Sequence, residues 1–197
     1  EGIEQSPVNL TGAIDGQGSL GFDYQDSHEE VVNNGHAIEL VYDPGSIVTF
    51  GDENYELLQF HLHTPSEHAV DGDLLPMEVH LVHRSGEGHY LVVGVLFEKG
   101  AADTVIEEFL ADVPMHMGEA HKGTRIHAGE LIDGVSSWYH YLGSFTTPPC
   151  TEGVSWFVAT KARTASAEQI DRINRAAGTN NRPTMPFGDR TLEIWTV

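Results

Sequence analysis

The sequence QFHLH at residues 59–63 alternates polar and apolar side chains. This two-residue period is typical of a β-strand with one face in a core, because successive side chains of a strand point to opposite faces. Gln59, His61 and His63 then share one face, and Phe60 and Leu62 share the other. The apolar pair can enter a hydrophobic core while the two imidazoles line a cavity.

A second alternating stretch, EVHLV at residues 78–82, contains a third histidine. By the same rule Glu78, His80 and Val82 share a face. If the two strands pair, three imidazoles converge, and such a set suits Zn²⁺ while leaving a fourth coordination position open. Gln59 and Glu78 each stand two residues from a histidine on the same face, where they can accept the second N–H of a metal-bound imidazole.

Other interpretations of the histidines have to be weighed. His-x-His on a strand is common, and a lone histidine is more often structural than a metal ligand. His61-Leu62-His63 followed by Glu67 also fits the His-x-His-x3-Glu core of a cupin, in which Glu67 would ligate iron or manganese. Tyr55 and Leu74 stand where the flanking cupin glycines would fall, and no second cupin motif follows. The cupin interpretation therefore ranks second.

The rest of the chain favours one mainly β domain with short peripheral helices. Short segments rich in β-branched or aromatic residues and bounded by turn residues are predicted as strands at Ile38–Tyr42, Ile47–Phe50, Glu56–His63, Met77–Arg84, Tyr90–Phe97 and Val154–Ala159. The turn RSGEG at residues 84–88 predicts that Met77–Arg84 and Tyr90–Phe97 form an antiparallel hairpin. Apolar spacing predicts a helix over Thr104–Ala111, and a capping box at residues 166–169 predicts another through about Arg175. No linker divides the chain, so we expect a single domain over residues 1–197 with a mostly antiparallel sheet.

The charge of the chain excludes two classes of partner. There are 30 acidic residues against 10 basic ones, and the formal net charge is −20. Nucleic acids and anionic membrane surfaces both require clusters of Lys and Arg, so neither is an expected partner. No apolar run of about 20 residues is present, so no membrane span is predicted. The acidic excess fits either solubility or a salt-rich habitat that screens self-repulsion, and we favour the second.

Beyond the histidines, the chain resembles an alpha-class carbonic anhydrase of the bacterial type over nearly its whole length. Six ordered segments carry the resemblance: Glu4–Leu10, Asn33–Ala37 (NNGHA), Gln59–His68, Met77–His83, Tyr141–Pro149 (YLGSFTTPP) and Asn180–Pro186 (NNRPTMP). The resemblance implies that family's fold, a central twisted sheet of about ten strands. It also implies a zinc enzyme, a carbonate dehydratase that reversibly hydrates carbon dioxide to bicarbonate and a proton.

The resemblance implies a role for each matching residue. The Zn²⁺ ligands would be His61, His63 and His80, and their hydrogen-bond acceptors would be Gln59, Glu78 and the main-chain carbonyl of Asn180. Thr146 would orient a zinc-bound hydroxide by accepting its hydrogen and donating to Glu67. His36 would shuttle protons to bulk solvent. The substrate pocket would be formed by Val82, Val92, Phe145, Thr147, Val154 and Trp156.

Further expectations come from the same resemblance. Sulfonamides and anions should inhibit, the location should be periplasmic or secreted, and a homodimer is one expected assembly. The family's segment upstream of Gln5 is missing from residues 1–197. Secreted bacterial members pair a cysteine of that segment with one at the position of Cys150, the single cysteine here. A non-catalytic binding relative is the alternative class; such relatives lose zinc histidines, whereas all three are present.

Overall fold

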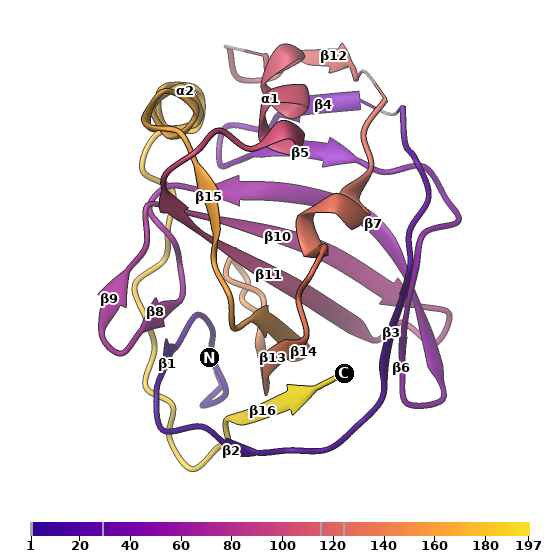
Figure 1. Cartoon of the computed structure of the whole chain (residues 1–197), viewed down its shortest axis with the longest axis vertical. Coiled ribbons are helices and arrows are strands. Elements are labelled where there is room, and N and C mark those ends of the chain that lie inside the picture. The colour runs from indigo at the N-terminus through magenta and orange to yellow at the C-terminus, as the bar shows by residue number, and fades with distance from the viewer. Residues whose placement is uncertain (1, 29, 115, 124) are drawn as a thin grey trace.

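The strands of this computed structural model, which describes residues 2–28, 30–114, 116–123 and 125–197, form a large and a small sheet (Figure 1). Within the described residues the large sheet has 13 strands: β2 (Ile14–Asp15), β3 (Leu20–Asp23), β4 (Glu30–Asn33), β5 (Ile38–Val41), β6 (Ile47–Phe50), β7 (Glu53–His63), β10 (Met77–Ser85), β11 (Tyr90–Lys99), β12 (Ala120–Lys122), β13 (Ser137–Ser144), β14 (Glu152–Ala159), β15 (Arg163–Ala165) and β16 (Glu193–Thr196). The small sheet has three: β1 (Asn9–Leu10), β8 (Ala69–Val70) and β9 (Asp73–Leu74).

The large sheet follows the order β12-β4-β5-β7-β10-β11-β14-β13-β16-β2, and β3, β6 and β15 pair off this path. Its pairs are antiparallel except β11–β14, β11–β15 and β16–β2. The predicted antiparallel hairpin is confirmed, because Met77 pairs with Phe97 and Arg84 with Tyr90. The expectation of a mostly antiparallel, mainly β fold is confirmed as well.

A β-bulge in β7 changes the face of the sheet on which the side chains before and after it lie. The register with β10 shifts between Val82 and His83, so that Val82 pairs with Gln59 while His83 pairs with Leu57. Leu58 is the extra residue, and it is exposed. A bulge re-aims the side chains that follow it. Leu57 and Phe60 can therefore both enter the same buried cluster, although three residues separate them.

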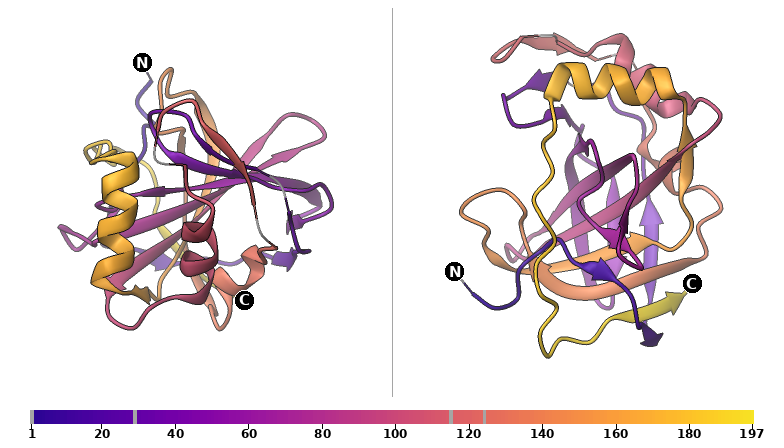
Figure 2. Two further views of the ribbon diagram at one scale, coloured as in Figure 1. Left: turned by 90° about the horizontal axis from the view of Figure 1, so that it is seen from above. Right: turned by 90° about the vertical axis from the view of Figure 1, so that its left-hand side faces the viewer.

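The helices cover one face of the sheet. Helix α1 (Thr104–Ala111) begins at Asp103, whose carboxylate accepts from the backbone N–H groups of residues 105 and 106. Helix α2 (Ala167–Ala177) begins with the capping box that the sequence predicts at Ser166, and a short 3₁₀ helix, η1, spans Ala128–Ile132. Figure 2 shows α1 and α2 beside each other at one end of the molecule. Their buried side chains join Phe60 and Leu62 in the larger apolar core.

A smaller apolar cluster lies on the opposite face of the sheet. It contains side chains of β10, β11 and β14 together with Val8 and Leu10 near the N-terminus and Leu192 near the C-terminus. The two ends of the chain therefore cover the face that the helices leave open. No helix among the described residues has the length and apolar character needed to cross a membrane.

Candidate metal centre

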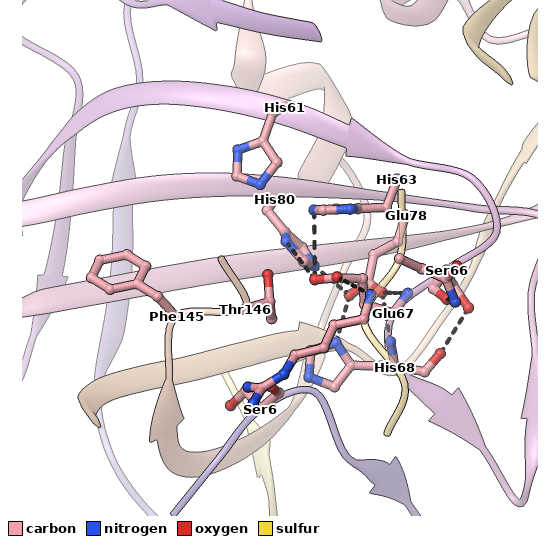
Figure 3. Close-up of polar contacts among 12 residues, drawn as sticks. Ser6, His61, His63, Ser66, Glu67, His68, Glu78, His80, Phe145 and Thr146 are labelled. Atoms are coloured by element: carbon pink, nitrogen blue, oxygen red, sulfur yellow. Dashed lines mark hydrogen bonds and ion pairs between the residues drawn. The ribbon is translucent and has the colours of Figure 1, made fainter. Parts of the chain in front are cut away.

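Figure 3 shows three histidines that converge, on the face of β7 opposite to Phe60 and Leu62, which pack with the helices. In the antiparallel register of β7 and β10, His80 lies opposite His61 and Glu78 lies opposite His63. The ring centroids are 5.0 Å apart for His61–His63, 5.3 Å for His61–His80 and 4.7 Å for His63–His80. One atom of each ring lies within 4.8 Å of the other two, so that a single ion could bind all three.

Hydrogen bonds determine which nitrogen of His61 and His63 faces the cavity. His61 Nδ1 lies 2.9 Å from the side-chain oxygen of Gln59, and His63 Nδ1 lies 3.1 Å from the main-chain oxygen of Asn180. Both partners are oxygens that only accept, so each Nδ1 carries the hydrogen. The Nε2 lone pairs of the two rings are therefore left for a ligand.

His80 is oriented the other way round. Its Nε2 lies 3.0 Å from Glu78 Oε1, in an orientation that falls short of hydrogen-bond geometry, and its Nδ1 faces Glu67 Oε2 at 3.8 Å. The Glu78 carboxylate can only accept, so Nε2 is the nitrogen that carries a hydrogen, and Nδ1 remains for a metal. Gly94, opposite His80 on β11, makes room for this carboxylate: a Cβ there would lie 3.0 Å from Glu78 Oε1.

Burial and mutual repulsion keep two of the histidines neutral. Burial lowers the pKa of His61, and the neighbouring His63 and His80 lower it further. Burial and His80 likewise lower the pKa of His63. For His80, burial lowers the pKa, but the Glu78 and Glu67 carboxylates together outweigh burial, so the pKa is raised overall. A metal has to displace any proton on the liganding nitrogen, so binding should be weaker at acidic pH.

Unpartnered polar atoms gather at the same place. His63 Nε2 and Glu67 Oε2, which lie 3.5 Å apart, are buried without a hydrogen-bond partner among the described residues. The other Glu67 oxygen accepts from the backbone N–H of Arg182 at 2.7 Å. Buried polar atoms are almost always satisfied in folded proteins, so such a cluster indicates the place of a ligand. Three imidazoles are the donor set that suits a catalytic zinc ion, and the residues therefore fit Zn²⁺.

A cavity of about 440 Å³ opens over the histidines. Among the residues that the sequence singles out, its lining includes His36, Gln59, His61, His63, Glu67, Thr146, Thr147 and Asn180. His36 is exposed between β4 and β5, and Asn180 Nδ2 donates to its main-chain oxygen at 3.1 Å. Thr146 follows β13 and is partly buried. Thr146 and Glu67 line the same cavity, but no hydrogen bond joins them among the described contacts.

The remaining pocket candidates lie in the smaller apolar cluster or against it, and they are not part of the cavity lining. Val82, Val92, Val154 and Trp156 are buried in the smaller apolar cluster, and Phe145 packs against it. Trp156 stacks edge-on against His80 with ring centroids 4.8 Å apart. Trp156 thus packs against the metal centre from the core, and of the predicted pocket residues only Thr147 is among those lining the cavity.

A buried hydrogen-bonded chain that the sequence did not indicate runs from the centre to the N-terminal segment. His68 Nδ1 lies 2.7 Å from Glu78 Oε1, and His68 Nε2 lies 2.6 Å from the hydroxyl of Tyr141. That hydroxyl lies 2.9 Å from Ser6 Oγ, which also accepts from the backbone N–H of Ser144 at 3.1 Å. The contacts join segments up to 138 residues apart. No local sequence pattern could have revealed them.

Comparisons with known proteins agree on one family. The chain matches the eukaryotic-type carbonic anhydrase family over residues 1–194. A carbonic anhydrase of Neisseria gonorrhoeae is 37% identical over 194 residues, which cover 97% of this chain and 77% of that protein. One from Pectobacterium atrosepticum is 34% identical over 194 residues, covering 97% of this chain and 80% of that one. The solved alpha-carbonic anhydrase of Thermovibrio ammonificans, in complex with the inhibitor sulfanilamide, has a TM-score of 0.94 and 34% identity, covering 98% of this chain and 87% of that one.

Proposed function

The chain belongs to the eukaryotic-type carbonic anhydrase family, whose members hydrate carbon dioxide, and from that membership we propose that it catalyses this reaction at a zinc ion held by His61, His63 and His80. The observation that carries the proposal is the convergence of three imidazoles whose free nitrogens face one another. The products are bicarbonate and a proton.

The ligand nitrogens would be Nε2 of His61, Nε2 of His63 and Nδ1 of His80, since the opposite nitrogen of each ring faces an acceptor. When bound, Zn²⁺ acts as a Lewis acid that makes hydroxide available near neutral pH, and carbonic anhydrase itself is the reference case for this chemistry. The acceptors hold the rings in orientation and increase their basicity.

Thr146 and Glu67 are proposed to select and orient the nucleophile. One oxygen of Glu67 is occupied by the Arg182 N–H, and the other is unpartnered and lies 3.5 Å from His63 Nε2. A hydroxyl of Thr146 that donates to this oxygen keeps only its lone pairs for the cavity. Thr146 then accepts a hydrogen from the nucleophile, which leaves the nucleophile's own lone pairs directed at carbon dioxide.

His36 is proposed to carry the proton out. It is exposed and lines the same cavity as the proposed ligands His61 and His63. Histidine is the side chain that ordinarily exchanges protons near neutral pH. His36→Ala should therefore slow turnover in weakly buffered solution, and added imidazole should restore it. Kinetics that His36→Ala leaves unchanged would rule out this role.

The test of the reaction combines metal analysis with carbon dioxide hydration, followed by the fall in pH. The purified chain should contain about one zinc ion, the number one three-histidine site can hold, and a sulfonamide should inhibit it. His61→Ala should lose both zinc and hydration. His121→Ala is the matched control, because His121 is an exposed histidine of β12 that neither lines the cavity nor belongs to a cluster able to hold a metal among the described residues. A metal-free native chain, or a zinc-loaded chain without hydration activity, would refute the proposal.

A further inference from the structure

Glu39 places a carboxylate in the cavity wall that the mechanism above does not use. It lies on β5 directly opposite His61 in the antiparallel β5–β7 pair. Directly opposed residues of neighbouring strands put their side chains on the same face of the sheet. The Glu39 side chain is therefore on the cavity side, and Glu39 is among the residues that line the cavity.

No cation neutralises this carboxylate among the described residues. The one hydrogen bond it makes within the described part of the chain is from Asn34 Nδ2 to Glu39 Oε2, at 3.5 Å. The ion pairs found in the described part of the chain do not include it. Partial burial raises the pKa of Glu39, as expected of a carboxylate that is incompletely hydrated. Water therefore screens its charge less than that of a fully exposed glutamate.

We propose that Glu39 determines the ligand selectivity of the cavity: its negative charge weakens the binding of anions, including bicarbonate and inorganic anions, relative to neutral ligands of similar size. The inference rests on the proposed function, because these ligands bind at the metal held by the three histidines. Carbon dioxide carries no charge, so its entry is unaffected, while the anionic product is held less tightly. Glu39 thus lowers the affinity of the site for the anionic product relative to its affinity for the neutral substrate.

The size of the effect follows from the position of the charge. Opposed residues of an antiparallel pair have Cβ atoms roughly 5 Å apart. The Glu39 carboxylate, beside His61, is then roughly 8 Å from an anion bound at the metal. With an effective dielectric constant of about 20 to 80, the repulsion between these two charges lowers the affinity for the anion roughly 2- to 30-fold. Removal of this one charge should therefore give a measurable change.

The experiment uses the full chain with Co²⁺ in place of Zn²⁺, so that ligand binding is read from the visible absorption spectrum. Thiocyanate, bicarbonate and neutral 1,2,4-triazole are titrated at pH 8.5 into the wild type, Glu39→Gln, Glu39→Asp and Glu98→Gln. Glu39→Asp keeps the charge and alters the side-chain length. Glu98 is an exposed residue of β11 outside the cavity lining, so Glu98→Gln removes the same unit of charge elsewhere.

The expected result is that Glu39→Gln binds thiocyanate and bicarbonate roughly 2- to 30-fold more tightly, while its affinity for triazole stays unchanged. Glu39→Asp and Glu98→Gln should resemble the wild type. Equal gains for triazole, or the same gain in Glu39→Asp, would show an effect of shape and overturn the inference. If the metal-loaded Glu39→Gln variant binds anions with the same affinity as the wild type, this inference alone is overturned. If the chain binds no metal, the proposed function is overturned together with this inference.

Discussion

Tyr141→Phe should destabilise the fold through the buried chain that joins Ser6 to the metal centre. The hydroxyl of Tyr141 lies 2.6 Å from His68 Nε2 and 2.9 Å from Ser6 Oγ, and all three side chains are buried. Without the hydroxyl, His68 Nε2 has no partner among the described residues, whereas Ser6 Oγ keeps the Ser144 N–H.

The two losses have different magnitudes. A buried polar group left without a partner costs about 1–3 kcal/mol, and a lost hydrogen bond whose other partners remain costs about 0.5–1.5 kcal/mol. The free energy of unfolding of Tyr141→Phe should therefore fall by about 1.5–4.5 kcal/mol. Equilibrium unfolding in urea, followed by tryptophan fluorescence, measures this difference.

Tyr139→Phe is the matched control. Tyr139 lies two residues away on β13, packs against the same apolar cluster, and its hydroxyl makes no hydrogen bond among the described residues. Its replacement should change the free energy of unfolding by no more than about 0.5 kcal/mol. If Tyr141→Phe were as stable as Tyr139→Phe, the buried chain would contribute nothing and the reasoning would be wrong.

Three further outcomes follow from the site, the core and the charge. Burial lowers the pKa of His83 to about 3, so His83 stays neutral in the folded protein at neutral pH. Its contribution to the free energy of unfolding is therefore complete above the unfolded-state pKa near 6.5. That contribution is lost as the pH falls from 6.5 toward 3, at up to about 1.4 kcal/mol per pH unit. Urea unfolding at pH 4.5 and 7 should show a smaller pH dependence in His83→Gln, and an unchanged slope would contradict this. Gln59→Ala removes the acceptor of His61 Nδ1 and should weaken zinc affinity about 10- to 100-fold in competition with a chelator; unaltered affinity would exclude an orienting role. The net charge of −20 should make the melting temperature rise between low and molar salt, and a flat or falling melting temperature would argue against salt adaptation.

Local signals predicted most of the longer elements, although the eight-residue strand β13 was not among the predicted strands. The hairpin of β10 and β11 depends on two alternating stretches and the turn between them, and the start of α2 depends on Ser166 and Gln169, which are three residues apart. Strands such as β2, β8 and β9 have two residues each and exist through pairing with other segments. Segments this short have no period of their own, so the sequence pattern does not reveal them.

Some features of the candidate metal centre could likewise be predicted from the sequence, and others depend on how the strands pair. Strand alternation alone placed Gln59, His61 and His63 on one face, and Glu78 with His80 on another, because a period of two is a property of any extended chain. The pairing of His80 with His61 in register, and the convergence of the ring nitrogens, depend on how β7 and β10 meet. The bulge at Leu58 is part of that pairing, and the sequence carries no mark of it.

The sequence by itself determined the residue types, the faces of the two histidine strands and, through resemblance, the family. Only the tertiary structure decided which nitrogen of each histidine is free, that the chain through His68, Tyr141 and Ser6 reaches the centre, and that Glu39 stands in the cavity wall. The physical reason is the separation along the chain of the residues that interact. Alternation and capping act between residues a few positions apart, whereas these contacts join strands and loops that meet only when the sheet has formed.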